Sequence, residues 1–484
     1  MDASSRADGD DLLYAPAMEQ AAAIRAGHVS SVELTQAQLQ RQDAILGLNA
    51  VVVRAAEAAL KDALRADGEL AGGQIRGPLH GVPFTAKDSL DTRALVTTWG
   101  TIGRRDHVPD RDAAVIARLR SAGAILTGKT NTPELTLSFI TDNDVYGLTS
   151  NPWDSSRSAG GSSGGAAVAV ASAASAFEIG SDLGGSIRVP AHFCGIAGLK
   201  PTAGRVPRTG HALPWGGPLD AFGTIGPMAR HSSDLLPLLN IIQGPDGLDP
   251  SVSRQTSATS SRTSAMLSAI SARQGRSELQ VARVGIYTGK TLQPPTPSIA
   301  GTLARAGEAL EAQGAYVDEV EIPALKEAWD LTSALFSVAA GPVVTSILRR
   351  AGTAQASRFL TGHASWSDGW SAEQLVALLH RIDACRSRLR AIFGQWDALL
   401  MPVAAWTAPT HEEAETLDYA YNYPHNLSGC PAVVVRAGTC DRGLPIGVQI
   451  VTNVWCEPLA VRLAETIEDA LGGYARPTPV TKDP

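Results

Sequence analysis

Two serines and a lysine are the residues of this 484-residue chain whose types and spacing best suit covalent chemistry. Ser162 lies in a glycine-rich run, residues 159–165, and Ser186 lies in a second one, residues 180–188. Lys87 ends an apolar, strand-like run that begins at Gly81. A serine hydroxyl attacks a carbonyl carbon when a nearby base takes its proton. An uncharged lysine can be that base, so these residues predict acyl transfer without histidine, metal or cofactor.

The segment between the two serines predicts that they meet in space. Residues 165–177 carry no charge and no proline and are rich in alanine, which indicates a buried helix. Roughly 13 helical residues rise about 20 Å, and residues 177–181 can return as a short strand. A helix in one direction and a strand back place the two glycine-rich turns on the same side, with Ser162 close to Ser186.

The glycines around Ser186 predict an anion-binding turn. Consecutive backbone N–H groups of Leu183, Gly184, Gly185 and Ser186 can line a concave nest. A tetrahedral acyl intermediate carries a negatively charged oxygen that such a nest would bind. We therefore expect these four N–H groups to form the oxyanion hole.

Other interpretations of these motifs fit the chain less well. Glycine-serine runs are commonly flexible linkers, but the apolar segment and the second turn argue against that here. Residues 123–130 match the letters of a phosphate-binding loop. The residues between its glycines are apolar and strand-like, and Pro133 follows where a long helix should continue, so nucleotide binding is not expected. For Lys87 alone, an ion pair with Asp88 or Asp91 is the default.

Over roughly residues 15–235 and 420–472 the chain resembles the amidase signature family. The order and spacing of the shared motifs agree along most of the chain. These motifs occupy residues 81–88, 128–134, 159–165, 180–191, 195–207, 226–230, 426–432 and 443–449.

The fold that we expect is α/β, a single large domain over residues 1–484 with a mixed central β-sheet covered by helices on both faces. We expect helices near residues 18–25, 31–46, 54–66, 111–122 and 298–313, and strands near 79–91, 124–127 and 282–287. A flexible lid is predicted at 335–344, hinged at Gly341-Pro342. The expected parts are an N-terminal helical segment (1–70), the catalytic core (75–235), an exposed excursion (243–278), a variable pocket region (325–425) and a C-terminal part that completes the core (426–472).

The resemblance implies a Ser–cis-Ser–Lys triad. Ser186 would be the nucleophile, Ser162 the bridging serine behind a cis peptide bond, and Lys87 the base. Burial disfavours the charged form of a lysine and lowers its pKa. We therefore predict a neutral Lys87, proton transfer from Ser186 through Ser162, and activity that rises toward alkaline pH.

Residues beside the triad receive supporting roles. Ser163 can join the proton relay or cap the following helix. Asp182 can accept N–H groups of the nucleophile turn, with Arg188 as its partner, although a surface ion pair is the alternative. His192 is expected to be a pocket wall rather than a base, and Cys194 to pack in the core.

The predicted function is an amidohydrolase that forms an acyl-enzyme on apolar or aryl amides, as an aryl acylamidase does, and possible substrates extend to carbamates. We expect aromatic residues of 325–425 to cover the acyl or leaving-group pocket: Trp329, Trp366, Trp370, Trp396, Trp406, Phe336, Phe359, Tyr419, Tyr421 and Tyr423. The alternative is the glutaminase component of a tRNA-dependent amidotransferase. That protein carries an acidic residue five positions before the proline that is Pro424 here, where this chain has Tyr419 and the adjacent Asp418. Intact triad residues argue against a third possibility, a catalytically silent binding protein.

Composition agrees with an enzyme acting on a small amide or carbamate. The net charge of −7 gives no electrostatic reason for binding nucleic acid. The start of the chain is acidic and polar, unlike a signal peptide, and no membrane association is expected. Five well-separated cysteines are interpreted as reduced thiols of a cytoplasmic protein. The histidines show no metal-binding spacing, and a monomer or homodimer is expected, with no metal or cofactor.

Overall fold

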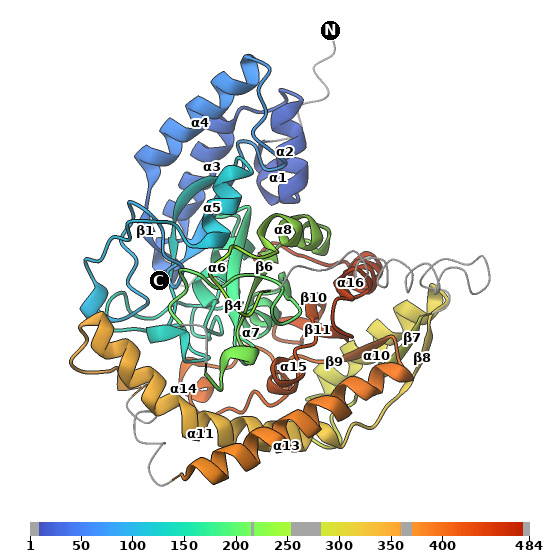
Figure 1. Ribbon diagram of the computed structural model, residues 1–484. Helices are drawn as coiled ribbons and strands as arrows, with labels where there is room; N and C mark the ends of the chain where they lie inside the picture. The colour runs from blue at the N-terminus through green and yellow to red at the C-terminus, as the bar shows by residue number, and fades with distance from the viewer. Residues whose placement is uncertain (1–8, 214–216, 253–281, 359, 361–369, 478–484) are drawn as a thin grey trace.

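Two sheets organise the chain, an eight-stranded one and a smaller three-stranded one beside it (Figure 1). The computed structural model describes residues 9–213, 217–252, 282–358, 360 and 370–477. In spatial order the large sheet contains β4 (Phe177–Asp182), β6 (Thr224–Ala229), β5 (Ala197–Lys200), β10 (Ala432–Thr439), β11 (Pro445–Thr452), β9 (Ala398–Pro402), β7 (Arg283–Ile286) and β8 (Tyr316–Glu319). The small sheet contains β1 (Val51–Arg54), β3 (Ile125–Thr130) and β2 (Pro83–Lys87).

Both sheets are mixed, as predicted. In the large sheet β7 runs parallel to β8 and β9, and the remaining neighbours pair antiparallel. In the small sheet β2 is parallel to β3, and β1 is antiparallel to it. Phe84 of β2 stacks on Phe177 of β4 with ring centroids 5.2 Å apart, which packs the end of the small sheet against the large one.

Helices cover both faces of the large sheet, which confirms the expected α/β architecture. Val433 and Val435 of β10 belong to the same core as Leu463 of α16 (Glu457–Leu471). Val434, between them, packs in a different core with Ala191 of α7 (Arg188–Cys194). Successive strand residues point to opposite faces, so α16 and α7 lie on opposite sides of the sheet.

Two groups of helices lie at opposite ends of the molecule (Figure 1). The N-terminal group, drawn in blue, is α1 (Gly9–Tyr14), α2 (Ala17–Arg25), α3 (Ser31–Ala44) and α4 (Ala56–Ala71). At the opposite end are α11 (Ala324–Ala351) and α13 (Ala372–Ala391). The remaining helices are α5 (Ala114–Ser121), α6 (Gly164–Ala171), α8 (Leu235–Ile242), α10 (Pro297–Ala312), α14 (His411–Ala414) and α15 (Tyr423–Ser428).

Most predicted elements are confirmed within a few residues, but β1 was missed. The predicted helix 54–66 begins at Ala56, and Val51–Arg54 before it is a strand. Val51 pairs with Thr130 and Arg54 with Gly128. This strand depends on a partner far along the chain, so local propensity does not reveal it.

The apolar helix between the two serines is shorter than predicted. It ends at Ala171 rather than near Phe177, and Ala173 adopts a left-handed φ of 57°. The guanidinium of Arg230 donates to the carbonyl oxygens of Val170 (2.9 Å) and Ser175 (2.7 Å). These bonds tie the end of the helix and the turn that follows it to the residue directly after β6. The expected helix-and-return arrangement nevertheless holds, because β4 begins at Phe177.

The segment predicted to be a flexible lid, 335–344, belongs to α11, and its movement as a lid stays a prediction. Pro342 lies inside this helix, and the segments Ala324–Ala339 and Gly341–Ala351 differ in direction by 45°. A proline inside a helix removes one hydrogen bond and bends the axis. In the described part of the chain, no single helix has the length and apolar character of a membrane span, and only this bent pair meets those two criteria jointly.

The predicted exposed excursion, 243–278, is described only up to residue 252, so 253–278 lie outside the described residues. Its beginning is partly buried rather than exposed. Asp249 is buried and accepts the backbone N–H of Arg208 at 2.9 Å.

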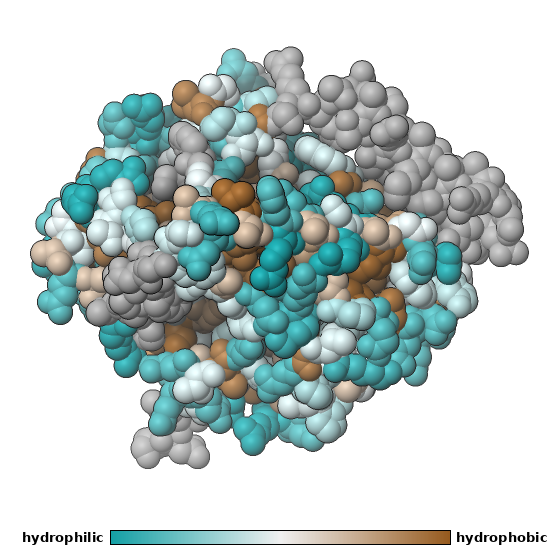
Figure 2. Space-filling view, turned by 60° about the horizontal axis from the view of Figure 1, so that its bottom comes forward, coloured by the Kyte–Doolittle hydropathy of each residue, from teal (hydrophilic) through white to brown (hydrophobic). Residues whose placement is uncertain are grey.

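One face of the molecule is shown as a surface in Figure 2. Hydrophilic side chains cover most of this face, and hydrophobic residues form smaller patches between them. The apolar side chains are concentrated instead in the buried clusters that hold the sheets and helices together.

Candidate active site

The three predicted reactive side chains come from three separate parts of the chain that meet near the C-terminal end of β4. Lys87 is the last residue of β2, Ser162 precedes α6, and Ser186 follows β4. Lys87 Nζ lies 2.7 Å from Ser162 Oγ, and both residues are fully buried. The Gly161–Ser162 peptide bond is cis. The N–H of Ser163 donates to the carbonyl oxygen of Ser186 at 3.1 Å, which holds the two serine turns together.

Ser186 lies at the surface of a cavity rather than inside the packed core. Its side chain lines two adjoining cavities, and Ser162 lines one of them. Between the Ser162 and Ser186 hydroxyls no direct hydrogen bond is formed in the described structure. Both residues nevertheless line the smaller of these cavities, so the two hydroxyls face a common space.

Lys87 is surrounded by hydroxyl groups rather than carboxylates. Besides Ser162, its Nζ lies 3.0 Å from Ser163 Oγ and 3.0 Å from Ser181 Oγ. Burial lowers the pKa of Lys87 to about 7, although the charges of Asp182 and Glu178 oppose that shift. A large fraction of the amine is therefore neutral at neutral pH, as a base requires.

The ion pairs expected by default for Lys87 are not formed. Asp88 instead faces Lys129, with 3.9 Å between Nζ and Oδ1. Asp91 pairs with Arg104 at 3.1 Å. Among the described residues, Lys87 has no carboxylate within ion-pair distance.

Ser181 is a site residue that sequence analysis missed. It is buried in β4, and its hydroxyl is one of the three around Lys87. The available signal was its position in the strand directly before the nucleophile turn. Ser163 stands at the N-cap of α6, but its side chain makes no capping bond and contacts Lys87 instead. The relay interpretation of Ser163 is thus the one that the contacts favour.

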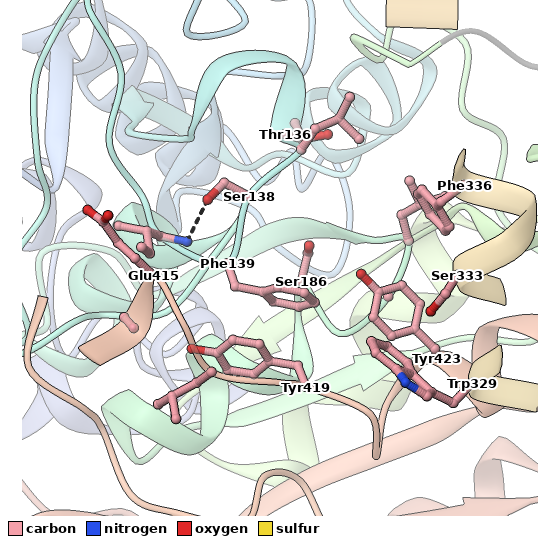
Figure 3. Close-up of a pocket in the computed structure, with 16 residues that line it drawn as sticks. Thr136, Ser138, Phe139, Ser186, Trp329, Ser333, Phe336, Glu415, Tyr419 and Tyr423 are labelled. Carbon is pink, nitrogen blue, oxygen red and sulfur yellow. Dashed lines mark hydrogen bonds between the residues drawn. The ribbon is translucent and has the colours of Figure 1, made fainter. Parts of the chain in front are cut away.

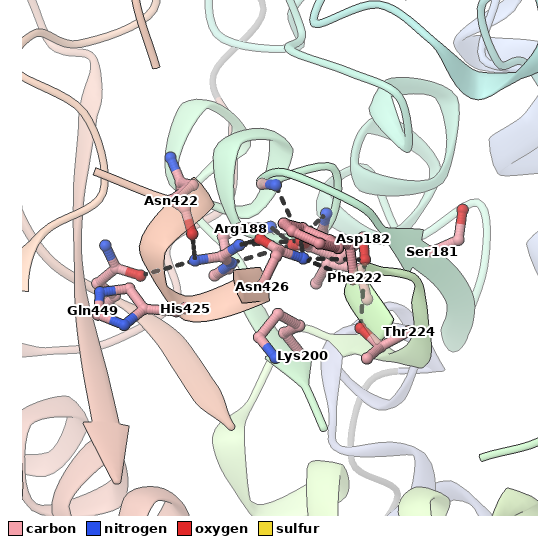
Figure 4. Close-up of polar contacts among 12 residues, drawn as sticks. Ser181, Asp182, Arg188, Lys200, Phe222, Thr224, Asn422, His425, Asn426 and Gln449 are labelled. Carbon is pink, nitrogen blue, oxygen red and sulfur yellow. Dashed lines mark hydrogen bonds and ion pairs between the residues drawn. The ribbon is translucent and has the colours of Figure 1, made fainter. Parts of the chain in front are cut away.

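Asp182 and Arg188 form a buried ion pair next to the turn that carries Ser186 (Figure 4). Arg188 Nη2 lies 2.9 Å from Asp182 Oδ1, and both side chains are fully buried, so the surface-pair alternative is wrong. Burial alone would raise the pKa of Asp182, but Arg188, Lys200 and Asn426 hold it well below its ordinary value. Asp182 therefore stays a carboxylate.

The same carboxylate holds the backbone of the turn. Asp182 accepts N–H groups from Gly185 (2.8 Å) and Ile187 (3.1 Å). Arg188 extends the network to the C-terminal part of the chain through the carbonyl oxygen of Asn422 (3.0 Å) and Gln449 Oε1 (3.3 Å) (Figure 4). These contacts join the turn that carries Ser186 to the C-terminal part of the chain.

The predicted oxyanion hole loses one of its four donors. Because the N–H of Gly185 donates to Asp182, it is not available to a substrate. In the described structure the N–H groups of Leu183, Gly184 and Ser186 make no hydrogen bond. Glycine is required here: Gly185 has φ of 129°, and a Cβ on Gly184 would lie 2.3 Å from a ring carbon of Tyr423.

We call the larger cavity at Ser186 the outer cavity; its volume is about 400 Å³ (Figure 3). Its walls are mainly aromatic and apolar, and Ser186 lies among Phe139, Trp329, Phe336, Tyr419 and Tyr423 (Figure 3). Phe139 stacks on Tyr419 with ring centroids 4.2 Å apart. The segment that contributes Phe139 was not predicted to reach the site.

Four of the aromatic residues predicted for the pocket line it, namely Trp329, Phe336, Tyr419 and Tyr423. Trp396 and Tyr421 pack elsewhere, and Trp406 stands behind Tyr419, edge-on to its ring. Trp370 is exposed and away from the cavity. Phe359 and Trp366 lie outside the described residues.

We call the smaller cavity at Ser186 the inner cavity; its volume is about 60 Å³. It shares Ser186 and Leu183 with the outer cavity, and Ser162, Ser181 and His211 line the inner cavity alone. Burial, together with Lys87 and Arg208, lowers the pKa of His211 to about 3, so its ring is neutral.

Other predicted features have structural roles. His192 is neither base nor pocket wall: its Nδ1 accepts the N–H of Gly447 at 2.7 Å, and its Nε2 lies 2.9 Å from the carbonyl oxygen of Trp406. Cys194 is buried in the core as expected, and all five cysteines are unpaired. Lys129, in the loop-like motif 123–130, is a buried strand residue that contacts Leu90 and Thr92, which rules out a phosphate-binding loop. The described residues contain no cluster of three potential metal ligands.

The chain is similar to known proteins along most of its length. The Amidase family profile matches residues 33–461. The chain is 33% identical to an indoleacetamide hydrolase of Bradyrhizobium diazoefficiens, covering 95% of this chain and 87% of that protein. It is 32% identical to the A component of a glutamyl-tRNA(Gln) amidotransferase of Moorella thermoacetica, with 96% and 98% coverage. Its fold matches that of a 6-aminohexanoate cyclic dimer hydrolase with a TM-score of 0.83 and 28% identity, over 97% and 100% of the two chains.

Fold and relatives together define a hydrolase that acts on carbon–nitrogen bonds. More particularly, the chain belongs to the Amidase family, the amidase signature enzymes. The resemblance inferred from the motifs is thereby confirmed over nearly the whole chain.

Proposed function

We propose that this chain hydrolyses linear carboxamides with apolar or aryl groups through a Ser186–Ser162–Lys87 triad and an acyl-enzyme. One observation carries the proposal: a fully buried amine, without a carboxylate partner in the described structure, lies 2.7 Å from a serine that shares a cavity with the nucleophile. An amine in that position can take the proton of the serine hydroxyl, because no neighbouring carboxylate among the described residues holds it in the charged ammonium form.

Acylation begins with neutral Lys87. The amine takes the proton of Ser162 while Ser162 Oγ takes the proton of Ser186. Ser186 Oγ then bonds to the amide carbon, and the carbonyl π electrons move onto oxygen. Ser162 next gives a proton to the amide nitrogen as the C–N bond breaks, and Lys87 returns its proton to Ser162. Water repeats the sequence on the acyl-enzyme and releases the acid.

The developing negative oxygen is bound by backbone N–H groups of Leu183, Gly184 and Ser186. Their lack of other partners in the described structure supports this assignment. Gly185 has a different task, because its N–H anchors the turn on Asp182. Each donor to an oxyanion typically accounts for about 10²–10³ in rate.

The outer cavity supports an apolar or aromatic substrate group. Its aromatic walls and volume of about 400 Å³ are suited to a ring. A relative named indoleacetamide hydrolase and another named acylamidase, from Rhodococcus erythropolis at 32% identity, agree with that choice. Carbamates fit the same attack, which would yield a carbamoyl-enzyme.

The glutaminase alternative is less well supported. Tyr419 lines the outer cavity, whereas Asp418, the nearby acid that could bind a glutamine ammonium, does not. Glu415 contributes a carboxylate to the wall of the outer cavity, but this carboxylate already pairs with Arg358 at 2.6 Å. A cytoplasmic location, a monomeric or dimeric state and the absence of nucleic-acid partners stay predictions.

The proposal is tested with the purified chain alone. Amine or ammonia release from a panel of aryl amides, aryl carbamates and glutamine is compared between wild type and Ser186→Ala. We expect amide hydrolysis by wild type and a loss of about 10⁴-fold or more in the variant. An aryl sulfonyl fluoride should label Ser186, as located by peptide mass. Labelling of another residue, or glutamine hydrolysis that appears only with partner proteins, contradicts the proposal.

A further inference from the structure

Two cavities of different size meet at Ser186, and together they offer separate spaces for the two sides of an amide substrate. The outer cavity holds about 400 Å³ and the inner cavity about 60 Å³. Leu183, Ser186 and Phe336 belong to the walls of both. An amide whose carbon lies at Ser186 Oγ can therefore direct one substituent into each cavity.

The position of Ser162 decides which substituent goes where. Ser162 is the hydroxyl that contacts Lys87 at 2.7 Å and delivers the proton to the departing nitrogen. Among the described residues it lines the inner cavity and not the outer one, as does Ser181. Proton delivery needs contact between the two heavy atoms. The nitrogen therefore points into the inner cavity, and the acyl group occupies the outer one.

Size then limits the leaving group. A cavity of roughly 150 Å³ is known to hold benzene, and the inner cavity offers less than half of that volume. Val344 of α11 and Leu213 form part of its apolar wall, and Val344 is fully buried. An aniline ring does not fit this space, whereas ammonia does. The outer cavity, by contrast, is large enough for an aryl or arylalkyl acyl group.

Polarity of the inner cavity agrees with a small polar leaving group. His211 Nδ1 accepts the N–H of Leu213 at 3.2 Å, so in the neutral ring the proton sits on Nε2. His211 Nε2 is buried, and in the described structure it has no hydrogen-bond partner. A buried donor without a partner is costly. Released ammonia, or the water that enters for deacylation, supplies the missing acceptor, which an alkyl group cannot.

We infer that this enzyme is selective for primary amides, with the aromatic acyl group in the outer cavity and ammonia released into the inner cavity. The inference rests on the proposed function, because it uses Ser162 as the proton donor. It narrows that function from aryl amides in general to those whose aryl group lies on the carbonyl side.

The test uses one acyl group and three leaving groups: 2-phenylacetamide, its N-methyl derivative and its anilide. We expect kcat/KM for wild type to fall by about 10-fold or more at each enlargement of the leaving group. Val344→Ala enlarges the inner cavity, so the N-methyl to primary ratio should rise about 10-fold. Leu213→Ala, in the same wall, serves if the first variant does not fold. Trp329→Ala is the matched control, because it enlarges only the outer cavity and should leave that ratio unchanged.

A crystal structure of Ser186→Ala with 2-phenylacetamide supplies a readout independent of turnover. The ring should lie against Tyr419 and Trp329, with the amide nitrogen near Ser162 Oγ. Equal rates on the three substrates, or a ring in the inner cavity, overturn the inference while leaving the proposed function intact. Failure to hydrolyse or bind any of the three amides counts against the proposed function itself, and the inference falls with it.

Discussion

Lys87 Nζ and Ser162 Oγ are 2.7 Å apart in a fully buried site, and in the described structure no carboxylate joins them. Lys87 comes from β2 of the small sheet and Ser162 from the turn before α6, so 75 residues of chain separate them. The pair joins the small sheet to the turn before α6, and the proposed mechanism depends on its protonation state.

The acid limb of the pH profile should report Lys87. Since burial lowers its pKa to about 7, the neutral form grows as pH rises through that value. We expect kcat/KM for an aryl amide to increase about tenfold per pH unit well below pH 7 and to level off above it. A profile of initial rates from pH 5 to 9 measures this. A plateau extending down to pH 5 contradicts a lysine base.

Replacing the amine should abolish turnover. Lys87→Met keeps a long apolar stem but removes the base, so we expect a loss of at least about 10³-fold in kcat, with the acid limb no longer visible. Circular dichroism and a thermal melt establish that the variant folds. The control is Lys326→Met, an exposed lysine on α11, whose activity should match wild type. Comparable rates in Lys87→Met and wild type refute the assignment.

Ser181 should tune the lysine without being essential. Its hydroxyl lies 3.0 Å from Lys87 Nζ and stabilises the ammonium form. Ser181→Ala therefore lowers the pKa of Lys87 and moves the acid limb to lower pH, by up to about one unit, while kcat falls about 10-fold. The matched control is Ser333→Ala, a serine of the outer cavity wall. An unshifted limb would assign Ser181 a packing role only.

The buried ion pair should dominate the stability of the nucleophile turn. Arg188→Met leaves the fully buried Asp182 without its cation, which costs about 3–5 kcal/mol of unfolding free energy. Urea denaturation at pH 7 measures the change. The exposed pair of Lys326 and Asp330 is the comparison, and Lys326→Met should barely move the midpoint.

The same pair predicts how stability depends on acid. Because the folded pKa of Asp182 is lowered, its contribution is complete above the unfolded value of about 4 and is lost as pH falls below it. Wild type should therefore lose stability between about pH 4 and pH 2 more steeply than Arg188→Met does. Parallel curves for the two proteins speak against this role.

The outer cavity should select the acyl group. Tyr419→Ala removes a ring that stacks on Phe139, so kcat/KM should fall about 10-fold or more for 2-phenylacetamide. For acetamide, which does not reach that ring, the change should be small. Trp370→Ala, an exposed tryptophan away from the cavity, should affect neither substrate. Equal losses on both amides indicate a general structural defect.

Local pattern was sufficient to single out Lys87, Ser162 and Ser186 as the proposed triad, because these residues lie in short motifs with unusual composition. Two features can be recognised in the sequence without knowing which residues are neighbours in space. They are the glycine-serine turns at Ser162 and Ser186 and the lone lysine, Lys87, after an apolar strand. The buried helix and return strand between the serines follow from the same composition, although the helix ends earlier than predicted, at Ala171. There Arg230, far along the chain, donates to the carbonyl oxygens of Val170 and Ser175.

Everything that depends on contacts between distant segments was decided by the tertiary structure. The sequence shows Ser181 only as a serine in a predicted strand, and its contact with Lys87 appears only in the folded chain. In the same way, only the structure shows that Phe139 stacks on Tyr419. The engagement of the Gly185 N–H by Asp182 and the unequal sizes of the two cavities follow from side-chain packing. Composition and spacing report which groups can react, because reactivity is a property of residue types. Burial, hydrogen-bond partners and cavity shape are properties of neighbours, and only the folded chain determines those.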